Sequence, residues 1–316
     1  MSLRGVGGDE GGAGLRMGFV GVSTAGSSIL AVFPAWAGVL GLPTRTLVGH
    51  DVPLDAPPER YRELVSTIAA NSDELGALVT THKVAVHDAA GDLFDALDEA
   101  ALAFGEVSCI AKRDERLLGS AKDPLTARLA LEEFLPADHF ATTGAAALVL
   151  GSGGAGTALS SQLAVRPDRP GEVVCTALDE AALHHARRVH ERCGVPDGLV
   201  RYVRTPSPQD VAALVEALPP ASLVVNATGM GKDRPGSPLP SGTRLPADGY
   251  VWDFNYRGSL ELLAQARAQE ATQHLHVEDG WRYFVHGWSQ AVAEVFGVPM
   301  PPETVAELAR VAAGTR

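Results

Sequence analysis

Short apolar runs alternate with longer amphipathic stretches after residue 140 of the chain. The apolar runs predict buried strands, and the stretches between them repeat their apolar positions with the spacing of a helix. The predicted strands are Ala146–Leu150, Glu172–Thr176, Leu199–Arg204, Ser222–Ala227, Tyr250–Phe254 and His274–Val277. The predicted helices between them are Ala155–Leu163, Asp179–Cys193, Pro208–Leu218 and Leu260–Gln269. This alternation indicates a doubly wound parallel sheet with helices on both faces.

The residues before 140 predict the same kinds of element in a less regular order. Strands are expected at Met17–Val22, Ala77–Thr80 and Val107–Ala111, and helices at Ile29–Leu40, Asp92–Ala103 and Leu125–Leu135. Pro124 precedes the last of these helices, where a proline is well tolerated. Trp281–Phe296 and Glu303–Ala313 predict two final helices with no strand after them. The pattern is that of an α/β protein, and 316 residues are enough for two domains.

Composition and charge narrow the class of protein. Hydrophobic residues make up 46% of the chain, which is typical of a globular protein. The formal net charge is −12 and Lys and Arg form no cluster, so nucleic acid is not an expected partner. No apolar run has the length of a membrane span, and the Gly-rich residues 1–15, expected to be a flexible tail, lack the apolar core of a secretory signal. The three cysteines fit no zinc-binding spacing, so no metal site is expected and a cytoplasmic location is favoured.

A glycine-rich loop follows the first strand of the alternating region. Its residues are Gly151, Ser152, Gly153, Gly154, Ala155 and Gly156. Gly151 permits a tight turn, Gly153 lets a pyrophosphate approach the backbone, and Gly156 lets the next helix pack close to the sheet. Free N–H groups at the helix start would face the phosphates. A glycine turn without a ligand is the alternative, but the strand–loop–helix context favours a Rossmann-type dinucleotide site.

The choice between NAD and NADP depends on the end of the second strand of this region. Thr176 is followed there by Ala177, Leu178 and Asp179, with no arginine for a 2′-phosphate and no acid directly at the strand end. Asp179 comes slightly late, and its alternative role is the N-cap of the next helix. The sequence therefore favours NAD and leaves NADP open.

Several further motifs follow one another in order along the chain. They are Gly21–Ser27, Val79–Lys83 with a His-Lys pair at its end, Gly119–Asp123, the glycine loop, Asn226–Thr228, Asp253–Tyr256, and Asp279-Gly280 followed by Val285. In this order they resemble the shikimate dehydrogenase family from about residue 17 to about residue 297. The resemblance implies a substrate-binding and catalytic domain at residues 16–124 and 284–316 and a cofactor domain at 125–283. It also implies cofactor contacts from Thr176, Asn226, Ala227 and Thr228.

By this resemblance, Lys83 and Asp123 form the catalytic pair. Reduction of a ketone by hydride builds negative charge on its oxygen, which a nearby ammonium can stabilise and protonate. A carboxylate beside the lysine would orient it and share the proton. Taken alone, Lys83 could be an ordinary surface lysine, and Asp123 could be the N-cap of the helix that begins at Pro124.

The residues expected around the substrate depart from the family pattern. The expected substrate contacts are Ser27, Thr80, Ser108, Tyr256 and His286. Polar family residues are replaced by Ile29, Leu78, Ser108, Ala121 and Gly287. Each buried polar group left without a partner costs about 1–3 kcal/mol, so shikimate itself is not expected to bind well. The residues that could compensate are Thr24, Ser28, His286, Trp288 and Gln290.

The expected function is an NAD(P)-dependent oxidoreductase acting on a secondary alcohol or ketone of a small polyhydroxylated ring, in a specialised pathway. The substrate would be cyclitol-like or shikimate-like, and the protein a monomer or homodimer. One alternative is an epimerase that oxidises its substrate transiently and retains the cofactor. Another is a ligand-sensing relative, which would not need the Lys–Asp pair. A dehydrogenase of one-carbon folate metabolism has a similar two-domain plan but a different lysine motif.

Overall fold

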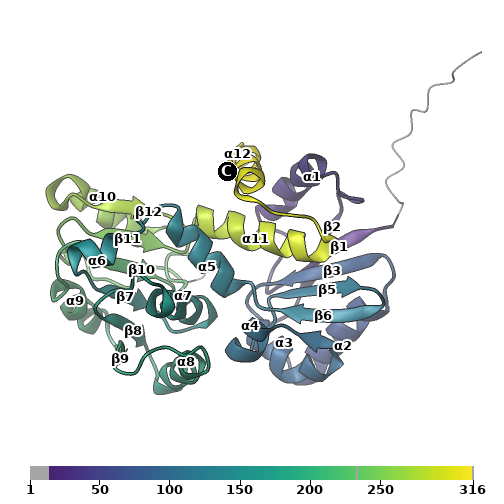
Figure 1. The fold of residues 1–316 in the computed structure, drawn as a ribbon, viewed down its shortest axis with the longest axis horizontal. Helices are drawn as coiled ribbons and strands as arrows, with labels where there is room; N and C mark the ends of the chain where they lie inside the picture. Colours follow the sequence, from purple (N-terminus) through teal and green to yellow (C-terminus); the bar gives the residue numbers. More distant parts are fainter. Residues whose placement is uncertain (1–13, 233, 315–316) are drawn as a thin grey trace, which may run out of the picture. The chain divides into compact units, whose positions relative to one another are not determined.

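The computed structural model describes residues 14–232 and 234–314 (Figure 1). The flexible tail expected at residues 1–15 therefore falls almost entirely outside the described residues. The chain folds as two compact units, and each is described by itself. The first comprises residues 14–98, Glu106–Ser120 and 288–314, and the second comprises Glu99–Gly105 and Ala121–Gly287.

The first unit contains a mixed six-stranded sheet in the order β2-β1-β3-β5-β6-β4. The strands are β1 (Arg16–Gly21), β2 (Leu47–Asp51), β3 (Glu74–Val79), β4 (Ala96–Leu97), β5 (Cys109–Arg113) and β6 (Arg116–Ser120). β1 pairs in parallel with β2 and β3, whereas β5 runs antiparallel to β3 and β6. The carboxyl ends of β1, β2 and β3 therefore lie at the same edge of the sheet.

Helices cover both faces of this sheet (Figure 1). They are α1 (Ile29–Leu40), α2 (Pro58–Ala70), α3 (Lys83–Ala90), α12 (Pro302–Ala313) and the second half of α11 (Trp281–Phe296). Val20 and Val79 pack with the apolar sides of α2 and α3. On the other face, Phe19 of β1 packs edge-on against Trp288 of α11, with ring centroids 5.0 Å apart. Trp36 Nε1 of α1 donates to the Leu308 carbonyl of α12 at 2.8 Å, so the end of the chain completes the first unit.

The expected helix Asp92–Ala103 is wrong in part. A 3₁₀ turn (Gly91–Leu93) is followed by β4, and only α4 (Glu99–Phe104) is an α-helix. The Asp95 amide donates to the Leu117 carbonyl at 2.9 Å, and β4 pairs with β6, so strand pairing prevails over the helical spacing of the sequence. α4 belongs to the second unit, where it packs against α8 (Glu180–Arg192).

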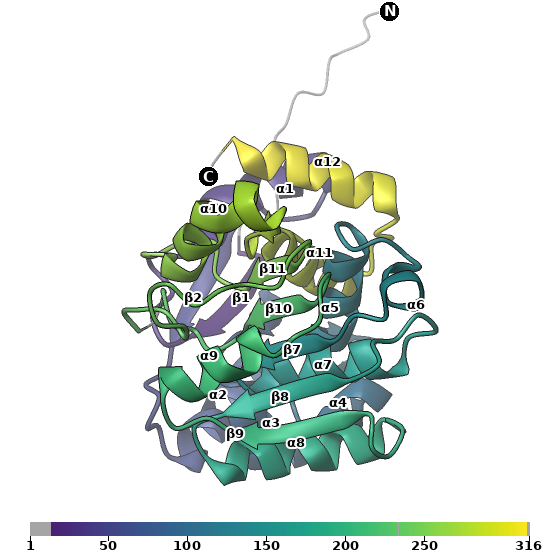
Figure 2. The ribbon, with the colours of Figure 1, turned by 90° about the vertical axis from the view of Figure 1, so that its left-hand side faces the viewer.

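The second unit contains an all-parallel sheet in the order β12-β11-β10-β7-β8-β9, of which Figure 2 shows the part from β11 to β9. The strands are β7 (Ala147–Leu150), β8 (Val173–Ala177), β9 (Val200–Arg204), β10 (Leu223–Asn226), β11 (Tyr250–Asp253) and β12 (His276–Glu278). Its remaining helices are α5 (Asp123–Glu132), α6 (His139–Thr143), α7 (Gly154–Val165), α9 (Pro208–Glu216) and α10 (Glu261–Gln273). This is the doubly wound order of a Rossmann-type fold, which confirms the expected fold class.

The four central strands of the second sheet, β7, β8, β10 and β11, send side chains into two cores. Ala147 and Val149 face a core that includes residues of α5 and α7, and Leu148 and Leu150 face a core that includes residues of α9 and α10. A strand buried on both faces reads as a continuous apolar run, which explains why these strands were predictable. No helix among the described residues is long and apolar enough to cross a membrane.

Candidate dinucleotide and substrate sites

The glycine loop lies at the carboxyl end of β7, between β8 and β10, where the strand order reverses. In open α/β sheets this switch point is where ligands bind. The Gly151 amide donates to the Thr176 carbonyl at 3.1 Å, and the Ala227 amide donates to the Leu150 carbonyl at 2.8 Å. The predicted cofactor residues on β7, β8 and β10 are thus brought together at one edge.

The three glycines of the loop have different surroundings. Gly151 has a φ of +95°, and a Cβ there would lie 2.9 Å from the Ala227 carbonyl oxygen. A Cβ on Gly156 would lie 1.9 Å from the Gly151 carbonyl oxygen, so only glycine permits this approach of α7 to the loop. A Cβ on Gly153 would meet no atom within 4 Å. Gly153 therefore faces open space, as a residue beside a bound pyrophosphate must.

The start of α7 offers hydrogen-bond donors to that space. Gly153 is the N-cap, no side chain caps the helix, and the first turn contains no acidic residue. The Thr157 amide donates to the Gly153 carbonyl at 2.8 Å, whereas the amides of residues 154–156 have no carbonyl of the same helix to which they could donate. Ser152 is different because its Oγ donates to the Thr176 carbonyl at 3.0 Å and its side chain is buried. The loop therefore fits a dinucleotide through its backbone amides.

A buried polar network stands at the ends of β10 and β11. Asn226 Nδ2 donates to Asp253 Oδ2 at 3.1 Å, and the Thr228 hydroxyl donates to Asn226 Oδ1 at 2.6 Å. The Asn255 amide donates to Asp253 Oδ1 at 2.9 Å, and both asparagine side chains donate to the Met230 carbonyl. Burial raises the pKa of the Asp253 carboxyl to about 6, and these donors act against that shift. The network holds the 228–231 loop, which explains why these two motifs occur together.

A basic group that the sequence alone did not reveal lies beside the end of β8. Asp179 does cap α8, because its Oδ1 accepts from the Ala182 amide at 2.9 Å. Arg204, the last residue of β9, is the register partner of Ala177. Its Nε donates to the Leu178 carbonyl at 3.1 Å. The only signal in the sequence was a basic residue at the end of a predicted strand.

In the first unit, the predicted residues of the catalytic strand lie together at the carboxyl end of β3. The Thr80 hydroxyl donates to the Val20 carbonyl at 3.0 Å. Lys83 is the first residue of α3 and is half-buried, and its carbonyl accepts from the Val107 amide at 3.0 Å. Ser108 is buried, and its Oγ lies 3.4 Å from the Ser120 carbonyl oxygen.

The serine-bearing loop is anchored to β2. Thr24 donates to Asp51 Oδ1 through both its amide, at 2.8 Å, and its hydroxyl, at 2.7 Å. These bonds lower the pKa of the Asp51 carboxyl. The Ser27 amide in turn donates to the Thr24 carbonyl at 3.0 Å. Thr24 is thus engaged in shaping the loop, whereas Ser27 remains half-buried.

Asp123, Tyr256 and His286 belong to the second unit. Asp123 is a buried residue at the start of α5, and the N-cap is Lys122, so the alternative in which Asp123 caps the helix is wrong. Tyr256 packs against Trp281 and Phe284 at centroid distances of 5.3 and 4.9 Å.

His286 is tied to α5 rather than open. Its Nε2 lies 2.7 Å from Glu133 Oε1, and Arg282 pairs with the same carboxylate at 2.6 Å. The His286 hydrogen bond is the main cause that lowers the pKa of Glu133. The bond to Glu133 fixes the orientation of the His286 imidazole. The role of His286 as a substrate contact stays a prediction.

The residues that depart from the family pattern are enclosed in the structure. Ile29 is fully buried, and Leu78 and Ala121 are nearly so. At Gly287, an added Cβ would lie 3.6 Å from the Thr126 methyl group. None of these positions offers the hydrogen bond of the polar residue it replaces.

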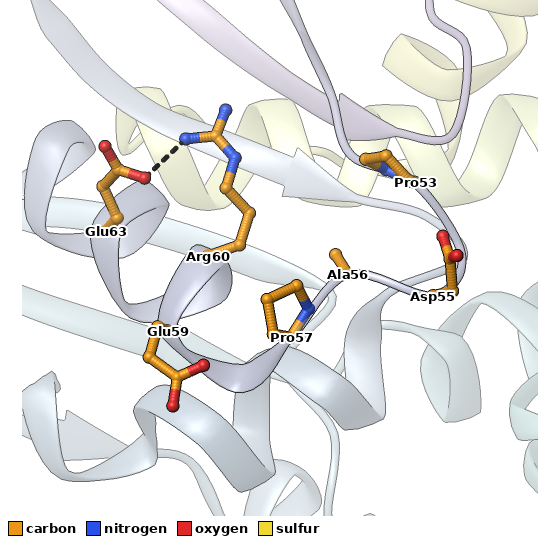
Figure 3. Close-up of a pocket in the computed structure, with 7 residues that line it drawn as sticks. All are labelled: Pro53, Asp55, Ala56, Pro57, Glu59, Arg60 and Glu63. Atoms are coloured by element: carbon orange, nitrogen blue, oxygen red, sulfur yellow. Dashed lines mark hydrogen bonds and ion pairs between the residues drawn. The ribbon is translucent and has the colours of Figure 1, made fainter.

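A separate open hollow occurs in the first unit at the start of α2 (Figure 3). It is lined by Pro53, Asp55, Ala56, Pro57, Glu59, Arg60 and Glu63. Arg60 pairs with Glu63 at 2.8 Å, and the other charged lining residues are acidic. No predicted cofactor or substrate residue lines this hollow.

The reversed strand order and the glycine loop define a class: α/β proteins with a Rossmann-type dinucleotide unit. No family model matches the chain. It is, however, 30% identical over 216 residues to the shikimate dehydrogenase (NADP(+)) of Streptococcus gordonii. The aligned residues cover 67% of this chain and 69% of that protein. The chain therefore belongs to the shikimate dehydrogenase family.

Solved structures agree with this assignment. Shikimate 5-dehydrogenase from Thermus thermophilus, in complex with NADP(H) and shikimate, superposes with a TM-score of 0.64 at 25% identity, covering 94% of this chain and 99% of that chain. Quinate dehydrogenase from Corynebacterium glutamicum, in complex with NAD, has a TM-score of 0.73 at 21% identity, covering 95% and 99%. The second likeness shows the shared fold alone.

Proposed function

We propose that this protein is an NAD(P)-dependent dehydrogenase for a secondary alcohol or ketone on a small polyhydroxylated ring. The observation that carries the proposal is the open backbone at Gly153, at the start of an uncapped helix and at the switch point of a Rossmann-type sheet. The named activities of the relatives support the same class of reaction. Their names include both NAD and NADP, so the proposal covers either cofactor.

In this proposal the glycine loop would bind the cofactor, and Lys83 and Asp123 would handle the charge and the proton on the substrate. The bound dinucleotide would supply or accept the hydride. Lys83 would stabilise the charge that grows on the substrate oxygen and exchange the proton there, and Asp123 would orient the lysine and share that proton. We propose a substrate domain at residues 16–124 and 284–316 and a cofactor domain at 125–283, bounds that differ from those of the two compact units at Glu99–Gly105, at residues 121–124 and at residues 284–287.

The substrate is proposed to differ from shikimate. Ser27, Thr80 and Tyr256 would supply polar contacts, with Ser108 and His286 beside them. Five positions, at Ile29, Leu78, Ser108, Ala121 and Gly287, no longer carry the residues expected for shikimate. A cyclitol or cyclic ketone with a different arrangement of hydroxyl groups fits this changed set.

The test is a screen of cyclitols, quinate and shikimate, followed by the absorbance of reduced nicotinamide, with each cofactor in turn. The expected result is turnover of one cyclitol or ring ketone and weak turnover of shikimate. Lys83→Arg is a sharp companion variant, because it keeps the positive charge but cannot release a proton at neutral pH. Efficient turnover of shikimate would refute the substrate argument. Absence of dinucleotide binding in calorimetry would refute the function.

A further inference from the structure

The end of β8 and the end of β9 together present a cation beside an apolar side chain. Arg204 is exposed at the end of β9, and its Nε is held by the Leu178 carbonyl at 3.1 Å. Leu178, the residue after β8, has 60% of its surface exposed. The guanidinium is therefore fixed at the turn that leaves β8, with an unusually open leucine next to it.

This turn is the place where a Rossmann-type fold receives the adenosine ribose. The glycine loop is joined to the same strand through the Thr176 carbonyl, which accepts from Gly151 and Ser152. A dinucleotide with its pyrophosphate on that loop would thus extend its adenosine along the end of β8. An acid at this point favours the free 2′-hydroxyl of NAD, and an arginine favours the 2′-phosphate of NADP.

The charges at this point favour the phosphate. In the described part of the chain no carboxylate forms an ion pair with Arg204, so no protein acid competes with a phosphate for its Nη groups. The nearby acid, Asp179, already accepts from the Ala182 amide as the cap of α8. An arginine matches a phosphate through paired N–H donors, and an exposed leucine offers an apolar surface for an adenine ring.

We propose that Arg204 binds the 2′-phosphate of NADP and that Leu178 supports the adenine, which makes NADP the preferred cofactor. Arg204 on β9 would then supply the basic group for the phosphate that is missing at Ala177, the last residue of β8. This inference rests on the proposed function in that it assumes a bound dinucleotide. It replaces the preference for NAD that the sequence of β8 alone suggested.

The experiment compares two small fragments by calorimetry: adenosine 2′,5′-bisphosphate and adenosine 5′-monophosphate. The wild-type protein is expected to bind the bisphosphate about 10- to 100-fold more tightly, the range of a charge-assisted hydrogen bond. Arg204→Ala should abolish that ratio and leave the affinity for the monophosphate nearly unchanged. NADP⁺ and NAD⁺ should show the same pattern.

Arg201→Ala is the matched control, because Arg201 lies on the same strand but pairs with Glu172 at 2.7 Å. It should keep the wild-type ratio. Equal binding of the two fragments by the wild type, or an unchanged ratio in Arg204→Ala, would overturn the inference while the proposed function stands. If neither fragment nor either dinucleotide binds, the proposed function fails as well.

Discussion

Two glycines of the phosphate loop should respond to substitution in opposite ways. At Gly153 an added side chain meets no atom within 4 Å, and the backbone is extended, with φ −76° and ψ −174°, which valine adopts readily. Gly153→Val should therefore fold normally, with a free energy of unfolding within about 1 kcal/mol of the wild type, because the gain of about 0.4–1 kcal/mol from a less flexible unfolded chain opposes the poorer capping of α7 by valine. Its side chain would occupy the space proposed for the pyrophosphate.

The loss of affinity in Gly153→Val follows from the donors it would screen. Each hydrogen bond from an amide to a charged phosphate contributes about 1.5–3 kcal/mol. Losing two of them weakens binding by about 100-fold or more. Gly156→Ala should behave differently, because its Cβ would lie 1.9 Å from the Gly151 carbonyl oxygen. α7 must then shift, at a cost of about 1–3 kcal/mol, and the melting temperature should fall by about 2–4 °C for each kcal/mol.

The assay is thermal unfolding followed by circular dichroism without ligand, and calorimetry with NAD⁺ and NADP⁺ on the same variants. The expected pattern is a stable Gly153→Val that does not bind and a destabilised Gly156→Ala. Unchanged affinity in a folded Gly153→Val would refute the placement of the pyrophosphate. A destabilisation of Gly153→Val as large as that of Gly156→Ala would refute the assignment of open space to Gly153.

Three further predictions concern catalysis and stability. Lys83→Ala should lower kcat by about 10²–10⁴-fold and leave the dinucleotide affinity measured by calorimetry nearly intact. Asp123→Asn should act similarly, and the double variant should be little worse than either single variant. Full activity in Lys83→Ala would disprove the catalytic pair. Because burial raises the pKa of Asp253 to about 6, the folded state binds more protons than the unfolded state between about pH 4 and 6, so this group's contribution to stability falls as the pH rises. Asp253→Asn should remove that contribution in urea unfolding at pH 4.5 and 7, and an unchanged pH dependence would contradict it. His190 lies 2.9 Å from Ser160 Oγ and 2.7 Å from the Tyr202 hydroxyl, and burial lowers its pKa to about 4. The contribution of neutral His190 to the free energy of unfolding should therefore be lost as the pH falls from about 6.5 toward 4. His190→Ala should flatten this pH dependence in the same assay.

The sequence by itself determined most of the second unit. Its four central strands, β7, β8, β10 and β11, are buried on both faces, so each appears as a short apolar run between helices. The glycine loop was recognisable because its geometry requires glycine itself, at Gly151 for the positive φ and at Gly156 for close packing. Motifs whose chemistry is local in sequence, such as Asn226–Thr228 and Asp253–Tyr256, could be read without a structure.

The first unit was less predictable because several of its elements have weak local signals. β2 is a half-exposed edge strand, so it shows no continuous apolar run. The hairpin that joins β5 to β6 turns at Asp114 and Glu115, both with positive φ, without the glycine or asparagine that usually signals such a turn. α3 is short and contains two β-branched valines, which lower its helical signal.

Only the tertiary structure decided which side chains meet across elements. Arg204 and Leu178 are 26 residues apart in the chain, and the parallel register of β8 and β9 brings them together. The same holds for His286 and Glu133, 153 residues apart, whose contact depends on where the fold places α11 beside the C-terminal end of α5. The register of parallel strands and the packing of helices arise from the whole core rather than from local propensity, so a basic residue on one strand could not be assigned in advance to the end of another.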